Sequence, residues 1–158
     1  MIYNLPVSDI VKQPHHIITT GAVYFVTSST RDRLILPDIA RKIALDSFKH
    51  FNGIRYKLYA ACVMPDHFHL LLYSLKDEDG EYFKLSVIMN SLKGFSSYQI
   101  CKELGIKGGV WHRGYYDVIL NTRKQKSECW DYILYNPVKD GLVRNWLDYP
   151  FVWSAGMP

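Results

Sequence analysis

Two segments with strand-like composition are separated by only three residues, and this spacing constrains the fold more than any other feature of the chain. Residues 55–63 and 67–74 are rich in aromatic and aliphatic side chains, which favour β-structure. The link between them is Met64-Pro65-Asp66, and its proline is expected in a turn because proline cannot donate to a central ladder. So short a link predicts an antiparallel hairpin.

The remaining elements lie on either side of this hairpin. Before it, a strand is predicted over residues 22–29, and a helix begins at Asp38, its expected N-cap, and ends at Asn52-Gly53. After it, the patterns predict a helix over 82–104, a strand over 110–120 and a helix over 124–136 that is stopped by Pro137. The order βαββαβα predicts an α+β fold, a ferredoxin-like antiparallel sheet with helices on one face and a further C-terminal helix.

Length and composition fit one domain spanning residues 1–158. Hydrophobic residues make up 48% of the chain and charged residues 22%, which is typical of a globular domain. We expect residues 1–20 to form an irregular lead-in and residues 141–158 to form a tail that packs on the body. The formal net charge of +4 permits a polyanionic partner without demanding one.

The cysteines and the apolar segments bear on the cellular setting. Cys62, Cys101 and Cys129 are widely spaced and odd in number, so neither a disulfide scaffold nor a zinc ribbon is expected. We expect a cytoplasmic protein, and no membrane association, because the sequence shows no signal peptide and no apolar stretch of membrane-spanning length. The aromatic content of 15% is high for a small domain, and base stacking or a tyrosine nucleophile would explain part of it.

His67-Phe68-His69 opens the second strand of the predicted hairpin. Because side chains alternate along a strand, the two imidazoles share one face and Phe68 points to the other. Two neutral imidazoles side by side provide half of a divalent-metal site. The alternative interpretation is a pair of surface or hydrogen-bonded histidines.

The helix expected over residues 124–136 supplies a second group of candidates. Its apolar stripe consists of Trp130, Ile133, Leu134 and Pro137. Tyr132 and Asn136 lie one turn apart on roughly the opposite side, together with Cys129. A phenol and an amide placed in this way can address one metal-bound phosphate. The alternative is that Tyr132 is an ordinary half-buried helix aromatic.

Basic residues near glycine and aromatic residues are candidates for contacts with nucleic acid. Lys93 precedes Gly94 inside a predicted helix, and a helical glycine indicates close approach by another backbone or by a ligand. Arg113 and Tyr115 belong to a stretch that suits single-stranded nucleic acid, or equally a sheet edge with core aromatics. Most other basic side chains are expected to be solvated, with a few on phosphates, and the loop residues Arg31 and Arg33 are candidates for these.

Several stretches, taken together, resemble the HUH single-tyrosine transposases, and among these the REP-associated tyrosine transposases. They are Val63–Leu71, Ser91–Ser96, Val110–Asp117, Tyr132–Val143 and Asp148–Ser154. The His-Phe-His triplet alone is a weak signal. Met-Pro-x-His-x-His-Leu, combined with Tyr-x-x-x-Asn-Pro and the βαββαβα order, is a specific one, and the resemblance covers nearly the whole chain.

The resemblance implies a function and the residues that perform it. His67 and His69 match the metal-binding pair, Tyr132 matches the nucleophile of a catalytic C-terminal helix, and Asn136 matches the polar residue that completes the metal shell. The implied cofactor is Mg²⁺ or Mn²⁺, and the implied partner is single-stranded DNA that carries a hairpin. The implied reaction is nicking and strand transfer in DNA transposition, through a 5′-phosphotyrosine intermediate.

Two positions depart from the family pattern, and two other functions stay open. Asp66 stands where the family commonly has Asn, and Val118 stands where it commonly has His, which is expected to affect substrate contacts. One alternative is a domesticated protein that binds DNA hairpins without transposition activity. The other is a metal-dependent hydrolase, although the sequence lacks the carboxylate cluster that such sites use. A homodimer and a monomer are both compatible with the resemblance.

Overall fold

The hairpin predicted from the spacing forms the middle of the sheet. The structure, a computed structural model, describes residues 21–158, and the lead-in expected over residues 1–20 lies outside the described residues. Strands β2 (Tyr56–Val63) and β3 (His67–Ser74) pair antiparallel. The Met64 N–H closes the turn between them by donating to the carbonyl of the first residue of β3 at 2.8 Å.

Five antiparallel strands form one sheet in the order β4-β1-β3-β2-β5. β1 (Val23–Ser29) pairs with β3 on one side and with β4 (Tyr116–Leu120) on the other. β5 (Val152–Ser154) pairs with β2, so the tail adds an edge strand that the sequence did not predict. With its three α-helices, this sheet confirms the predicted α+β fold.

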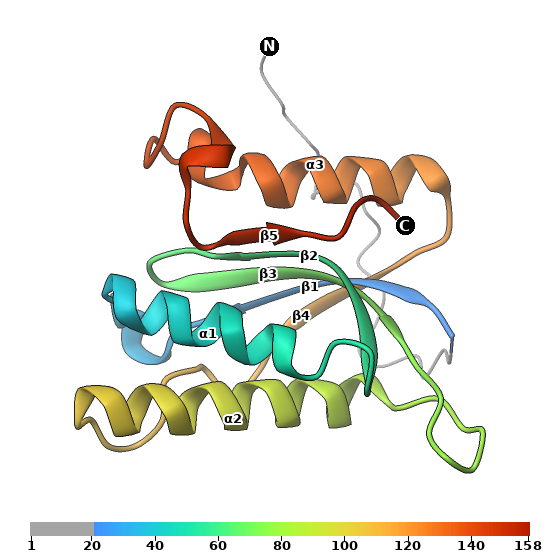
Figure 1. The fold of residues 1–158 in the computed structure, drawn as a ribbon, viewed down its shortest axis with the longest axis horizontal. Helices are drawn as coiled ribbons and strands as arrows, with labels where there is room; N and C mark the ends of the chain where they lie inside the picture. Colours follow the sequence, from blue (N-terminus) through green and yellow to red (C-terminus); the bar gives the residue numbers. More distant parts are fainter. Residues whose placement is uncertain (1–20) are drawn as a thin grey trace.

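Helices cover both faces of the sheet. α1 (Asp38–His50) and α2 (Leu85–Leu104) pack together on one face, and α3 (Arg123–Lys139) lies across the other (Figure 1). We call the face under α3 the histidine face, because His67 and His69 point from it toward α3. The central strands are therefore apolar on both sides rather than alternating. Over the described part of the chain, none of the helices has the length and apolar character required to cross a membrane.

Two helices begin at positions other than those predicted. Asp38 is the first residue of α1 rather than its N-cap, and its carboxylate accepts a hydrogen bond from Arg41 in the next turn. α2 begins at Leu85 rather than at residue 82. The Phe83 N–H donates to a carbonyl just beyond the end of β3 at 2.9 Å, which keeps the residues before α2 extended.

α3 is not stopped by Pro137, as the sequence predicted, but continues to Lys139. A proline has a helical φ, and here its missing N–H removes one hydrogen bond near the end of the helix. The Asp140 N–H donates to the Asn136 carbonyl at 3.0 Å and closes the last turn.

The side of α3 that is buried differs from the predicted stripe. Its buried residues are Cys129, Ile133, Leu134, Asn136 and Pro137. Cys129 and Asn136 were expected opposite the apolar residues, but α3 packs on the sheet and is also contacted by the tail, which widens the buried arc. Trp130 is only half-buried, and its Nε1–H donates to the Ser154 hydroxyl of β5 at 2.9 Å.

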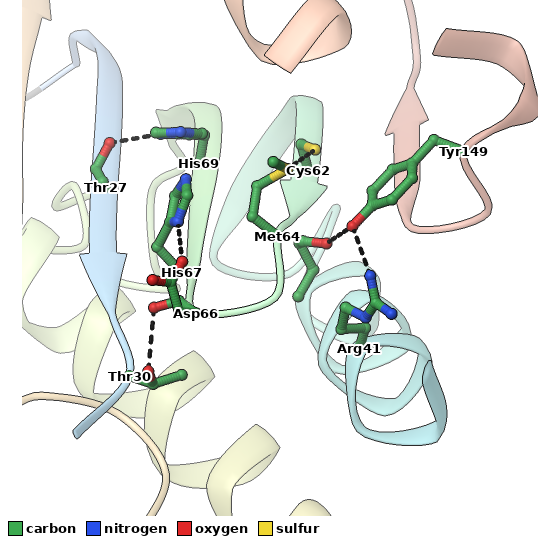
Figure 2. Close-up of polar contacts among 10 residues, drawn as sticks. Thr27, Thr30, Arg41, Cys62, Met64, Asp66, His67, His69 and Tyr149 are labelled. Atoms are coloured by element: carbon green, nitrogen blue, oxygen red, sulfur yellow. Dashed lines mark hydrogen bonds and ion pairs between the residues drawn. The ribbon is translucent and has the colours of Figure 1, made fainter. Parts of the chain in front are cut away.

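A buried tyrosine joins the tail to the end of the central hairpin. The Tyr149 hydroxyl donates to the Val63 carbonyl at 2.7 Å and accepts a hydrogen bond from Arg41 at 3.0 Å (Figure 2). The Arg41 guanidinium also lies 4.5 Å from the centroid of the Phe151 ring. These contacts connect α1, β2 and the tail beside the turn that precedes His67.

We expect the substitution Tyr149→Phe to lower the free energy of unfolding by about 1–2 kcal/mol, because it leaves a buried carbonyl without its partner. Denaturant unfolding followed by circular dichroism measures this. Tyr98→Phe is the control, since Tyr98 is 65% exposed, and it should change the free energy by less than about 0.5 kcal/mol. An equal effect of the two substitutions would contradict the role given to Tyr149.

Candidate active site

Three aromatic side chains meet between β3 and α3. The ring centroids of His67 and His69 are 4.8 Å apart, and the His69 and Tyr132 centroids are 5.2 Å apart in an edge-on arrangement. The ring centroid of Phe25 on β1 lies 5.6 Å from that of His69 and 5.9 Å from that of Tyr132. Phe68 lies on the opposite face, where it packs on Phe48, as the alternation predicted.

Each histidine has its Nδ1 atom in contact with an oxygen atom. His67 Nδ1 lies 2.6 Å from Asp66 Oδ1, and His69 Nδ1 lies 2.7 Å from Thr27 Oγ1 (Figure 2). A carboxylate can only accept, and a hydroxyl can accept, so both contacts suit imidazoles that carry the proton on Nδ1. In that tautomer, Nε2 has a free lone pair, which is the form in which histidine binds a metal.

The Nε2 atom of His69 is buried and has no hydrogen-bond partner among residues 21–158. The residue is 4% exposed, and burial, followed by the charges of His67 and Lys139, lowers the His69 pKa to about 3. His69 is therefore neutral at physiological pH. A buried nitrogen with a free lone pair is costly unless it is satisfied, and a bound divalent ion would satisfy it.

The candidate donors are two imidazoles and an amide, a neutral set that could hold a divalent cation. Over residues 21–158, no cluster of three His, Cys, Asp or Glu side chains could hold a metal ion. Asn136 is 3% exposed and lies one turn beyond Tyr132 on α3, which makes its amide the candidate for a third donor. Cys62 pairs with His69 across the sheet, but burial raises the pKa of its thiol, which therefore stays protonated.

Tyr132 is half-buried rather than set apart from the core. Its ring packs on Phe25 and His69, and Lys139 Nζ lies 5.4 Å from its ring centroid. The prediction that Tyr132 stands apart from the apolar side of its helix is therefore wrong. It does face His69, as the metal-site hypothesis requires, and Lys139 places a positive charge over its ring.

Several of the expected DNA contacts have structural partners. Lys93 Nζ donates to three successive carbonyls, those of His112, Arg113 and Gly114, at 2.6 to 3.1 Å. These bonds hold the loop before β4 and explain why β4 begins at Tyr116 rather than at residue 110. A Cβ added to the neighbouring Gly94 would meet open space, so the close approach by another backbone predicted there is wrong.

The basic and aromatic candidates do not all lie on the histidine face. Tyr115 is half-buried beside Lys93 of α2, and α2 is on the other face of the sheet. Arg31 contacts the carbonyls of Lys107 and Gly108, so its guanidinium braces the same loop. Arg33 and Arg113 are exposed at the end of the sheet where His67 lies.

Tyr116 is a residue of the histidine face that the sequence analysis missed. In the register, Tyr116 pairs with Thr27, and Thr27 pairs with His69, so the three side chains lie in one row across β4, β1 and β3. Tyr116 is 43% exposed. Val118, which departs from the family pattern, pairs with Phe25 on the same face.

Comparisons with known proteins agree with this fold. The sequence model of the IS200-like transposases matches residues 24–136, so this chain belongs to that family of DNA transposases. A protein of Haemophilus influenzae that bears the name REP-associated tyrosine transposase is 26% identical over 140 residues, which cover 84% of this chain and 80% of that protein. The resemblance seen in the sequence motifs is confirmed.

A solved structure shows a similar fold. It is a REP-associated tyrosine transposase bound to a REP hairpin, and it aligns with a TM-score of 0.65 at 23% sequence identity. The alignment covers 90% of this chain and 82% of the other.

The depressed pKa of His69 predicts how stability depends on pH. Below about pH 6.5 the unfolded chain binds a proton at His69 that the folded protein does not bind until about pH 3, so stability falls as the pH falls through this window. Denaturant unfolding between pH 6.5 and about 4.5 should show a slope that approaches about 1.4 kcal/mol per pH unit from this residue. His69→Gln should lose that contribution, whereas His112→Gln, at an exposed histidine, should keep it. Identical slopes in the native protein and His69→Gln would contradict the assignment.

Proposed function

We propose that this protein nicks and rejoins single-stranded DNA that carries a hairpin, through a transient 5′-phosphotyrosine bond at Tyr132. The observation that supports this most is the contact between the Tyr132 ring and His69, whose buried Nε2 has no hydrogen-bond partner among the described residues. A nucleophile beside a metal ligand suits attack on a phosphodiester that the same metal binds.

The residues divide the chemistry between them. The Tyr132 hydroxyl attacks the phosphorus atom, an Oη–P bond forms, the bond to the 3′ oxygen breaks, and that oxygen leaves as a 3′-hydroxyl after taking a proton. His67, His69 and Asn136 would hold a divalent ion, which supplies Lewis-acid stabilisation of charge on the phosphate oxygens when it is bound. Because the ligands are neutral, they leave the ion its full charge for the phosphate.

Lys139 suits a supporting role at the phosphate. It is exposed at the end of α3, and its Nζ lies 5.4 Å from the Tyr132 ring centroid. A cation there stabilises negative charge on the phosphate under attack. The phosphotyrosine bond conserves the energy of the phosphodiester, so a second 3′-hydroxyl can reverse the attack and join strands without a nucleotide cofactor.

Three observations support hairpin DNA as the substrate. The similar solved structure is bound to a REP hairpin. In this chain, Arg33 and Arg113 are exposed at the end of the sheet where His67 lies, and they are free to contact phosphates. Tyr116 offers an exposed ring on the histidine face, suited to stacking on an unpaired base near the scissile phosphate.

We expect Tyr132→Phe to abolish a covalent protein–DNA adduct, because the nucleophilic oxygen is lost. The assay incubates the protein with Mn²⁺ and end-labelled single-stranded hairpins from the DNA that flanks its gene, followed by a denaturing gel. Tyr135→Phe is the matched control, three residues along α3 at an exposed position, and should keep the adduct. An adduct of undiminished yield with Tyr132→Phe would show that the nucleophile is another residue. A native protein that binds the hairpins without an adduct would favour the domesticated binding protein.

We expect Tyr116→Ala to weaken binding of single-stranded hairpin DNA about 10- to 100-fold, and Tyr116→Phe to preserve binding, because stacking needs the ring and not the hydroxyl. Fluorescence anisotropy with a labelled oligonucleotide measures this without requiring cleavage. Tyr98→Ala, at an exposed tyrosine of α2 on the far face, should leave the affinity unchanged. A larger loss of DNA affinity with Tyr98→Ala than with Tyr116→Ala would contradict this proposal, because it would indicate that the DNA binds the face covered by α2.

A further inference from the structure

We infer that Asp66 is a positioning residue for His67: its carboxylate holds the imidazole with the proton on Nδ1 and Nε2 available to the divalent ion. This inference rests on the proposed function and deepens it, because it gives a role to a residue that departs from the family pattern. Asp66 touches neither the tyrosine nor the DNA in this account, and it acts only through His67.

A short contact between Asp66 and His67 supports this inference, and its chemistry allows only the imidazole to be the donor. Asp66 Oδ1 lies 2.6 Å from His67 Nδ1, slightly shorter than the distance of about 2.7–2.9 Å that is typical of a charge-assisted N–H···O hydrogen bond. An ionised carboxylate has no proton to give, so Nδ1 must be the donor. When the His67 ring is neutral, its lone pair then lies on Nε2. A carboxylate behind a histidine is a common arrangement in metal sites, where it fixes the ring orientation and the tautomer.

The backbone around Asp66 is held from outside the hairpin. The Thr30 N–H and hydroxyl both donate to the Asp66 carbonyl, at 2.8 and 3.1 Å (Figure 2). The Leu36 N–H donates to the Pro65 carbonyl at 2.7 Å. The carboxylate therefore extends from a turn that is fixed at two successive residues, so its position against His67 does not depend on the flexibility of a loop.

Asp66 also contributes a charge that an asparagine could not. An amide oxygen at this position would still accept the Nδ1–H bond, but it would be neutral. The three proposed ligands are two imidazoles and an amide, and none carries a negative charge. The Asp66 carboxylate places a negative charge beside the Nδ1 atom of His67. This charge increases the electron density that Nε2 offers to the ion. The family's common Asn would supply orientation alone, whereas Asp66 supplies orientation and charge.

The two contributions can be separated with two substitutions. Asp66→Asn keeps the acceptor and removes the charge, whereas Asp66→Ala removes both. On the metal-free protein at about pH 8, where an ordinary imidazole is neutral, ¹⁵N–¹H correlation spectra report the tautomer of each ring. We expect His67 to carry its proton on Nδ1 in the native protein and in Asp66→Asn, and to populate the Nε2–H form in Asp66→Ala.

Metal affinity supplies the second measurement. Titration with Mn²⁺, followed by the electron paramagnetic resonance signal of the free ion, should show that Asp66→Ala binds 10- to 100-fold more weakly than the native protein, with Asp66→Asn between them. Asp46→Asn is the matched control, because Asp46 is exposed, pairs with Lys42 and belongs to α1, which lies on the face of the sheet opposite α3. It should bind Mn²⁺ with the native affinity.

Two results would overturn the inference: a native His67 with its proton on Nε2, or an Asp66→Ala protein that binds Mn²⁺ as tightly as the native one. Failure of the proposed function gives a different pattern. If the native protein bound no Mn²⁺, the metal site itself would be wrong. If Mn²⁺ bound as expected but Tyr132→Phe still formed the adduct, only the nucleophile assignment would fail.

Discussion

The antiparallel pairing of β3 between β1 and β2 is the constraint on which the rest of this structure depends. Register places Thr27 opposite His69 on one side and Cys62 opposite it on the other. A slip of one residue would turn both histidines to the face covered by α1 and α2, and would put Phe68 under α3. Burial of both faces makes such a slip costly, since apolar side chains fill each layer. The register therefore determines that both imidazoles point toward α3.

This arrangement buries polar groups in the core, which lowers the stability of the folded protein. His69 lies among aromatic rings, its Nε2 has no hydrogen-bond partner in the part of the chain that the structure describes, and burial keeps it neutral. Such a group destabilises the fold unless a ligand satisfies it, so binding of a divalent ion is expected to stabilise the folded protein by mass action. The surrounding contacts offset part of the cost: Thr27 and Asp66 hold the Nδ1 atoms, and Tyr149 ties the tail to the strand end beside the turn.

Local pattern was enough to predict the hairpin, the shared face of His67 and His69, and the order of the elements. These follow from a three-residue link and from the alternation of a strand, both of which are local. The buried side of α3 could not be predicted in this way, because the tail and the sheet together bury Asn136, and the tail's position is a long-range contact. Tyr132 was selected on an argument about its helix that the structure does not support, although its contact with His69 agrees with the role.

The start of β4, the position of β5 and the role of Asp66 could not be predicted from local sequence pattern. The parity of β4 decides that Tyr116, and not Tyr115, lies on the histidine face, and Lys93 sets that start by binding the carbonyls of the preceding loop. β5 has only three residues and forms by pairing with β2. So short a strand shows almost no recognisable pattern in the sequence. The role of Asp66 required the side-chain geometry, because in sequence it appears only as a turn residue.

The central claim is that the histidine face holds one divalent ion through both imidazoles, opposite Tyr132. Electron spin-echo envelope modulation of the Mn²⁺-loaded protein tests it most directly, because it detects ¹⁴N nuclei bound to the ion and the number of histidine ligands. The account predicts two imidazole nitrogens bound to a single Mn²⁺, one in each of His67→Ala and His69→Ala, and the same two in Tyr132→Phe. A Mn²⁺ signal with no bound imidazole nitrogen, or one that neither histidine substitution changes, would contradict it.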